Sequence, residues 1–226
     1  MATPPGVKYF PYSSYRAGQE EIIEANRSTI RDRGLALLES PTGTGKTLNA
    51  IVPGLEAVER GEIKGIMFVT PRKTQHAVVF DDVRRINKQG HEFRVLNLVS
   101  KSDLCINENG LQCAYGDCRF MPGKGGQTKL GKPKSKEKIQ QLLGSLSKER
   151  PSLDVPTTLS FGKRVEYCPH RAVLDFAHEA EVVVCDYNYV FSPAIANIMA
   201  KKEMEYGKRL LVVDEGHNLY DRVLAF

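Results

Sequence analysis

Short apolar runs alternate with longer stretches of helical periodicity along most of the chain. Runs suited to buried strands occupy residues 35–38, 65–70, 93–99, 181–186 and 209–213. Stretches with apolar residues at helical spacing follow Gln19 and occupy residues 48–60, 74–86, 169–179 and 193–203. Pro53 should kink or end its helix early. The alternation predicts an α/β fold, a parallel sheet with right-handed crossovers and helices on both faces.

The alternation breaks between Lys101 and Tyr167. This stretch holds Gly and Pro clusters and no convincing strand, and residues 123–134 are typical of a flexible basic loop. Residues 136–146 could form a short amphipathic helix, and residues 151–158 indicate a further loop. So long an insertion without regular structure needs something else to hold it. We therefore divide the chain into residues 1–100, 101–168 and 169–226.

Composition describes an ordinary soluble protein, but its positive charge is concentrated. The 226 residues are 41% hydrophobic and 26% charged, with a net charge of +5. Residues 119–150 hold seven Lys and two Arg against two Glu, a net of +7, which leaves −2 for the remainder. Such a segment could follow a single-stranded nucleic acid or could simply be a solvated loop.

The sequence shows no sign of a membrane segment. The first residues lack the apolar run of a signal peptide, and no stretch is long enough to span a bilayer. We expect a cytoplasmic protein, or a nuclear one if its source is eukaryotic. In a reducing compartment the five cysteines are better interpreted as metal ligands, reactive thiols or core residues than as disulfides.

Residues 39–47 have the composition of a phosphate-binding loop. They lie between an apolar run and a helical stretch, the order that such a loop requires. Gly43 and Gly45 allow consecutive N–H groups to point at phosphate oxygens. Lys46 and Thr47 would hold phosphate and Mg²⁺, although Ser40 replaces the first Gly of the strict pattern. The predicted binding residues are Thr42, Gly43, Thr44, Gly45, Lys46 and Thr47. The alternative is a Gly-rich surface turn.

An acidic pair follows the apolar run at 209–213. Asp214 and Glu215 would lie at the carboxyl edge of the sheet, where ligands bind in open parallel sheets. Asp214 is predicted to complete the Mg²⁺ shell and Glu215 to polarise the attacking water. Gln19 could read a base edge from upstream of the loop, or could act only in packing the first helix.

Four cysteines lie in or at the edge of the insertion: Cys105, Cys113, Cys118 and Cys168. Their thiolates could hold the insertion around zinc or an iron–sulfur cluster. The gaps of seven, four and 49 residues suit a cluster somewhat better than the close pairs of zinc sites. His170 could replace one ligand, but packing at a helix start is the simpler interpretation. Cys185 lies in an apolar run and is predicted to be a core residue.

Several of these motifs together resemble superfamily 2 helicases. Residues 214–217, Asp-Glu-Gly-His, are similar to the DEAH box, residues 40–47 to the first helicase motif, and residues 69–75 to motif Ia. The surroundings of the four cysteines and residues 182–189 resemble the iron–sulfur helicases of the XPD/DinG group. Gly216 replaces the usual Ala. The family's second motor domain, its arginine finger and its arch-like insertion have no counterpart in this sequence.

The resemblance implies the N-terminal part of a 5′-to-3′ DNA helicase with a RecA-like P-loop fold. It implies ATP and Mg²⁺ as ligands and a four-iron four-sulfur cluster on the four cysteines. Lys46, Asp214 and Glu215 would be catalytic, Gln19 would read adenine, and His217 would couple nucleotide to DNA. Single-stranded or forked DNA would contact four residues: Thr70, Arg72, Lys101 and Lys124.

The resemblance also implies dependence on a second motor domain, supplied in cis or in trans. Without it we expect little or no DNA-stimulated ATPase activity from these 226 residues. Two alternatives remain open. One is a non-catalytic nucleic-acid-binding or regulatory module that retains the fold of a helicase half. The other is a zinc-stapled P-loop ATPase unrelated to helicases.

Overall fold

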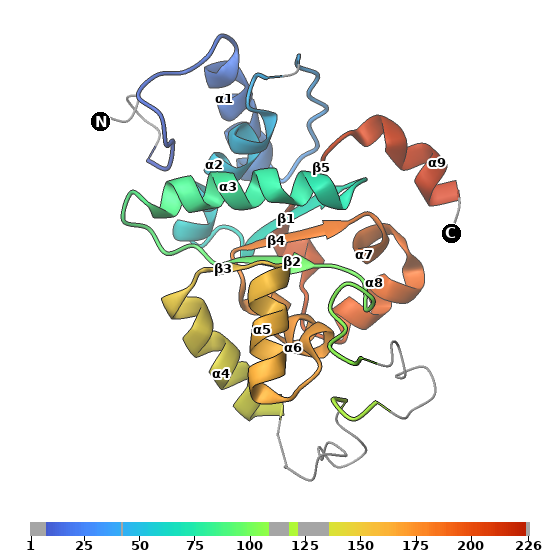
Figure 1. Cartoon of the computed structure of the whole chain (residues 1–226). Helices are drawn as coiled ribbons and strands as arrows, with labels where there is room; N and C mark the ends of the chain where they lie inside the picture. The colour runs from blue at the N-terminus through green and yellow to red at the C-terminus, as the bar shows by residue number, and fades with distance from the viewer. Residues whose placement is uncertain (1–7, 42, 109–117, 122–135, 225–226) are drawn as a thin grey trace.

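A parallel β-sheet forms the centre of the molecule (Figure 1). The structure is a computed structural model that describes residues 8–41, 43–108, 118–121 and 136–224. Within these residues five strands are arranged in the order β3-β2-β4-β1-β5, and every pairing is parallel. The strands are β1 (Gly65–Thr70), β2 (Val95–Leu98), β3 (Ser152–Leu153), β4 (Val182–Asp186) and β5 (Arg209–Val213). The predicted α/β fold is confirmed.

Side chains of the central strand β1 alternate between two hydrophobic cores. Ile66 and Phe68 belong to one core, and Met67 and Val69 belong to the other. β1 pairs with β4 on one side and β5 on the other, so that Met67 stands opposite Val183 and Leu211. Because successive strand residues face opposite sides, one apolar run supplies both cores.

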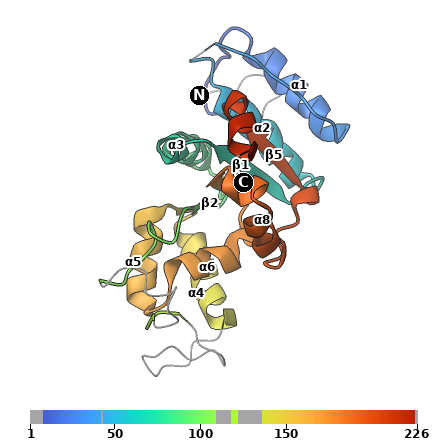
Figure 2. The same cartoon turned by 90° about the vertical axis from the view of Figure 1, so that its right-hand side faces the viewer.

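Helices cover both faces of the sheet. One core joins the sheet to the first three helices, α1 (Gln19–Arg31), α2 (Lys46–Glu59) and α3 (His76–Asn87). The other joins it to the helices between β2 and β5, which are α4 (Lys136–Glu149), α5 (Val155–Val165), α6 (Pro169–Phe176), α7 (Asn188–Phe191) and α8 (Pro193–Ala200). Figure 2 shows α4, α5 and α6 on the opposite side of the sheet from α1 and α2. The last described element is α9 (Leu219–Leu224).

Most predicted elements are present with shifted ends. The predicted helix at 74–86 begins with a 3₁₀ turn, Lys73–Gln75, before α3. The helix at 169–179 is α6 followed by a second 3₁₀ turn, Ala177–Glu179. Further 3₁₀ turns, Tyr206–Lys208 and Gly216–Asn218, flank β5. No helix in the described part of the chain is both long and apolar enough to cross a membrane.

The prediction that residues 151–158 form a loop was wrong. Ser152 and Leu153 form β3, which pairs with β2, and α5 begins at Val155. Asp154 caps this helix by accepting a hydrogen bond from the Thr157 N–H at 3.0 Å. Pro156 suggested a loop, but a proline is compatible with the first helical turn. α4 and α5 also contribute Leu143 and Phe161 to the same core as Met67, whereas the domain boundaries at 100 and 168 stay a prediction.

The expected break at Pro53 was also wrong. Proline has no N–H, so the carbonyl of Asn49, four residues earlier, loses its donor within the helix. The side-chain amide of Asn26 in α1 donates to this carbonyl at 3.0 Å. A neighbouring helix thus replaces the missing hydrogen bond, and α2 continues without interruption to Glu59.

The predicted strand at 35–38 was wrong as well. These residues have no regular secondary structure, and the side chains of Leu35 and Leu37 are 97% and 96% exposed. β5, predicted to be a buried strand, is an edge strand whose outer side pairs with no described residue. Its Leu211 is 42% exposed. An apolar run becomes a buried strand only where neighbours cover it.

Candidate nucleotide site

The phosphate loop has the backbone conformation that its glycines allow. Gly43 and Gly45 have φ values of 83° and 77°, in the left-handed region that strains other residues. α2 begins immediately afterwards at Lys46, so the loop lies at the N-terminal end of a helix, the end that attracts anions. Lys46 is exposed and Thr47 is half-buried. Thr42 lies outside the described residues.

Side chains on both sides of the loop hold its shape. The hydroxyls of Ser40 and Thr44 are 2.8 Å apart, and that of Thr44 donates to the carbonyl of Pro41 at 2.9 Å. The Arg16 guanidinium donates to the carbonyl of Gly43. Ser40, which departs from the strict motif, therefore has a role in closing the loop.

The acidic pair lies at the carboxyl edge of the sheet. The N–H of Asp214 donates to the carbonyl of Val69 at 2.9 Å, which continues the pairing of β5 with β1. The Tyr187 hydroxyl lies 2.5 Å from the Asp214 carbonyl and 3.0 Å from that of Glu215. Glu215 itself adopts a left-handed conformation with φ of 52°. The tyrosine thus fixes the turn that presents both carboxylates.

Electrostatics place Lys46 within range of Asp214. Burial raises the pKa of the half-buried Asp214 carboxyl, and repulsion from Glu215 raises it further. The Glu215 N–H and the positive charge of Lys46 both act to lower that pKa. The lysine of the phosphate loop and the first acid of the pair therefore lie at the same edge of the sheet, as a triphosphate site requires.

His217, the last residue of the box, is exposed beside the acids. Its Nδ1 lies 3.5 Å from a carboxylate oxygen of Glu215, and its Nε2 lies 3.0 Å from the side-chain amide of Asn218. A protonated imidazole would form an ion pair with Glu215. The coupling role assigned to His217 stays a prediction.

Gln19 is buried behind the phosphate loop rather than open to solvent, with 3% of its surface exposed. Its Oε1 accepts a hydrogen bond from the Arg16 N–H at 2.8 Å, and its Nε2 donates to the side chain of Asn49 at 2.9 Å. Both polar ends of the amide therefore already have partners within the protein. The contact with adenine stays a prediction. Sequence reasoning missed Asn49, whose only signal is an amide in a largely apolar helix.

The candidate nucleic-acid residues are partly described. Thr70 is fully buried, and its hydroxyl donates to the carbonyl of Arg72 at 3.0 Å, which shapes the turn after β1. Arg72 and Lys101 are exposed, and Lys124 lies outside the described residues. Contact of these residues with nucleic acid stays a prediction.

Three of the four insertion cysteines are described. Cys105, Cys118 and Cys168 are half-buried, and none of them forms a disulfide with another described residue. The Cys168 N–H donates to the carbonyl of Phe120 at 2.9 Å, so the turn after Cys118 meets the start of α6. Cys113 lies outside the described residues, and no metal-binding group of three or more His, Cys, Asp or Glu occurs among the rest. The four-cysteine ligand set stays a prediction.

Two further residues, one beside Cys168 and one in β4, have shifted pKa values. Burial lowers the pKa of His170 to about 4, with contributions from the charges of Lys101 and Arg171. Lys101 thus lies near the residue pair Cys168–His170 at the start of α6. Cys185 in β4 is fully buried, which confirms the prediction of a core residue, and burial raises its thiol pKa well above the usual value.

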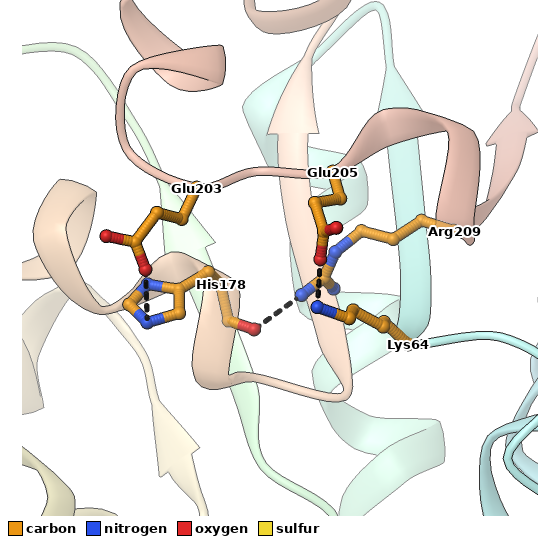
Figure 3. A pocket seen from close by; sticks show the side chains of 5 residues that line it. All are labelled: Lys64, His178, Glu203, Glu205 and Arg209. Carbon is orange, nitrogen blue, oxygen red and sulfur yellow. Dashed lines mark hydrogen bonds and ion pairs between the residues drawn. The ribbon is translucent and has the colours of Figure 1, made fainter.

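A cavity of about 310 Å³ lies at the opposite edge of the sheet, where β1 and β5 begin (Figure 3). Arg209 reaches across it and donates to the carbonyls of Ala180 and His178 at 3.0 and 2.7 Å. Lys64 forms an ion pair with Glu205 at its rim. These contacts tie strand beginnings together, and the cavity is separate from the acidic pair at the carboxyl edge.

The fold and the loop define a RecA-like P-loop domain. A solved structure described as an XPD helicase matches 94% of this chain and 34% of its own with a TM-score of 0.62 and 22% identity. A structure described as a truncated XPD matches 93% of this chain and 55% of its own with a TM-score of 0.57 and 21% identity. A family model described as DEAD_2 matches residues 69–225, more than half of the chain. The chain belongs to the DEAD_2 family.

Curated relatives of the chain are much longer than the chain itself. The ATP-dependent DNA helicase XPD of Sulfolobus acidocaldarius is 24% identical over 205 residues, which cover 90% of this chain and 33% of the relative. A regulator of telomere elongation helicase 1 homolog from Drosophila erecta is 23% identical over 261 residues, covering 93% and 25%. The chain therefore spans about a third or less of the length of these curated relatives.

Proposed function

We propose that the chain is the N-terminal, ATP-binding part of an ATP-dependent DNA helicase of the XPD type. In the complete enzyme it would couple ATP hydrolysis to 5′-to-3′ movement along single-stranded DNA. The observation that supports this best is the shared sheet edge of the phosphate loop and the acidic pair, where the charge of Lys46 acts on Asp214. The names of the relatives agree with it.

Each residue of the site has a role in this proposal. Lys46 neutralises the β- and γ-phosphates, while Thr47 and Asp214 hold Mg²⁺. Glu215 orients the attacking water, and its left-handed backbone turns it away from the strand direction. These roles need Lys46 and both acids to face one ligand, which their common edge allows.

The DNA side of the proposal rests on the insertion and on the turn after β1. Arg72 and Lys101 are exposed and would contact phosphates together with Lys124, while the buried Thr70 would act by shaping the turn that carries Arg72. The four cysteines would hold a four-iron four-sulfur cluster, with zinc as the alternative. The half-buried state of the three described thiols and a neutral His170 two residues after Cys168 are compatible with either occupant. Iron, sulfide and zinc analysis after anaerobic purification distinguishes the two.

Nucleotide titration tests the proposal directly. We expect the purified chain to bind a fluorescent ATP analogue with Mg²⁺, and Lys46→Ala to weaken this binding by about tenfold or more, because a charge-assisted phosphate contact is lost. Lys64→Ala is a matched control, since Lys64 lies at the opposite edge of the sheet. The proposal fails if the wild-type chain does not bind the analogue. It also fails if Lys46→Ala binds the analogue as tightly as Lys64→Ala does.

The complete reaction needs more than this chain in our proposal. We propose that a second motor domain, in cis or in trans, supplies the arginine that stabilises the transition state. The enzyme would act in the cytoplasm, or in the nucleus of a eukaryote. The 226 residues alone should bind ATP yet show little or no DNA-stimulated hydrolysis. Robust DNA-stimulated turnover by the chain alone would contradict this part.

A further inference from the structure

Asn49 connects three parts of the nucleotide site. It lies in the first turn of α2 and is fully buried. Its side-chain oxygen accepts from Gln19 at 2.9 Å, and its side-chain nitrogen lies 3.4 Å from the carbonyl of Thr44 in the phosphate loop. Its backbone N–H donates to the Gly45 carbonyl at 3.0 Å, and its own carbonyl accepts from Asn26 at 3.0 Å.

The amide orientations in this chain of contacts follow from its two ends. The Arg16 N–H can only donate, so Gln19 presents its oxygen to it and turns its nitrogen towards Asn49. Asn49 must then present its oxygen to Gln19. Its nitrogen therefore faces the Thr44 carbonyl, which can only accept. One consistent arrangement satisfies all four groups.

The pair of amides also touches the loop backbone. A Cβ built on Gly45 would lie 2.6 Å from the Gln19 nitrogen and 3.9 Å from the Asn49 oxygen. Gln19 and Asn49 thus fill the space directly behind the second loop glycine. A shift of either side chain would change the position of the backbone that faces the phosphates.

We propose that Asn49 is a positioning residue of the phosphate loop, and that Gln19 acts on nucleotide binding through Asn49. The proposal rests on the function given above, in which the loop binds a triphosphate. Both polar ends of the Gln19 amide are engaged within the protein, so its effect reaches the ligand through the loop. In that function the loop contacts phosphates and no base. Loss of the Gln19 side chain should therefore weaken the binding of ATP and the binding of GTP by the same factor.

Two single variants and their combination test this coupling. Dissociation constants for ATP and GTP are measured with Mg²⁺ by displacement of a fluorescent ATP analogue. We expect Gln19→Ala and Asn49→Ala each to weaken both nucleotides by about tenfold, the effect of losing one buried hydrogen-bonded partner. The double variant should be no weaker than the worse single variant, because the two residues act as one unit.

Three outcomes overturn the proposal. A Gln19→Ala variant that loses affinity for ATP but not for GTP indicates base reading. Additive losses in the double variant indicate independent roles. Unchanged affinities in Asn49→Ala remove the role of Asn49, while a wild-type chain that binds no triphosphate refutes the proposed function itself. If Asn49→Ala does not fold, the ATP-to-GTP ratio of Gln19→Ala still decides.

Gln140→Ala provides a matched control. Gln140 also donates a side-chain amide hydrogen bond to a backbone carbonyl, that of Asp175 at 2.8 Å, but it does so in α4 on the other face of the sheet. Its removal should leave both dissociation constants unchanged. A tenfold loss in this variant would show that the assay reports general destabilisation, which would overturn the assignment to Asn49.

Discussion

β1 and the segment before the phosphate loop are both apolar in sequence but differ in structure. Residues 35–38 and 65–70 are both short apolar runs, the first preceded by a glycine and the second beginning with one. All six residues of β1 are buried between β4 and β5, whereas Leu35 and Leu37 are almost entirely exposed. The difference lies in the neighbours that each run finds. A strand is stabilised by cross-strand and core contacts, so composition alone does not determine whether one forms.

The same contrast recurs within one row of the sheet. Met67 in β1 and Leu211 in β5 are register partners, yet Met67 is fully buried and Leu211 is 42% exposed. β5 pairs with only one described strand, so its outer side lacks a cover. The position of a residue in the sheet, rather than its side-chain type, decides how much apolar surface it buries and how much it adds to stability.

The largest expected effect comes from truncating the buried member of this row. Met67→Ala should lower the free energy of unfolding by about 2–5 kcal/mol, since it removes a core side chain and leaves a cavity. Leu211→Ala is the matched variant and should cost about 1 kcal/mol or less, because Leu211 already contacts water. Urea denaturation of the two variants measures both values. Equal losses would break the comparison.

The second largest effect is expected at Asp82, where burial acts on a charged side chain instead of an apolar one. Asp82 on α3 is 7% exposed, and burial raises its pKa from 3.8 to about 6 although Arg85 lies 3.0 Å away. Between these values the folded state binds more protons than the unfolded state, so stability falls as pH rises from about 4 to 6. Asp82→Asn should therefore be more stable than wild type at pH 7.5, by roughly 2–3 kcal/mol.

The pH dependence and a neighbour check the origin of this effect. The advantage of Asp82→Asn should shrink towards zero below about pH 4, where the wild-type carboxyl is protonated in both states. Asp81→Asn removes an exposed ion pair with Arg84 and a weak repulsion of Asp82, so it should change stability by less than about 1 kcal/mol at every pH. Thermal unfolding from pH 3.5 to 8 measures all three proteins. A constant difference across this range would show that Asp82 does not titrate as described.

The smallest effect is expected at the exposed leucines. Replacing Leu35 and Leu37 together with Ser should change the free energy of unfolding by less than about 0.5 kcal/mol, because water already surrounds both side chains. The same change should raise solubility, since it removes exposed apolar surface. Urea denaturation and a precipitation assay measure the two results. A loss comparable to that of Met67→Ala would show that the segment pairs as a strand in solution.

Much of the sheet could be predicted from the sequence because its central strands are continuous apolar runs. β1, β4 and β5 lie within two residues of their predicted ends. β3 was missed because two residues next to a proline carry no periodic signal, and only β2 beside them makes a strand. Pro156 and Pro53 misled for a related reason. Their effects depend on a cap and on a neighbouring helix, which a sequence read in order does not reveal.

The candidate site divides in the same way. The phosphate loop and the acidic pair were predictable because their chemistry is local: glycines before Lys46, and carboxylates after an apolar strand. The buried contact of Gln19 with Asn49 was not, because the two residues lie 30 positions apart and meet only when α1 packs on α2. Tyr187, which fixes the acidic turn from its place just after β4, was missed for the same reason.

The bond from Asn26 to the carbonyl left open by Pro53 has a consequence for inheritance. A proline at position 53 is tolerated while position 26 carries a side-chain donor, and a donor at 26 is dispensable once position 53 regains its N–H. Among relatives these two positions should therefore change together. Asn26 lies two helical turns beyond Gln19 on α1. Relatives that keep the proline should therefore also keep the contact between α1 and α2. That contact holds Gln19 in place behind the phosphate loop.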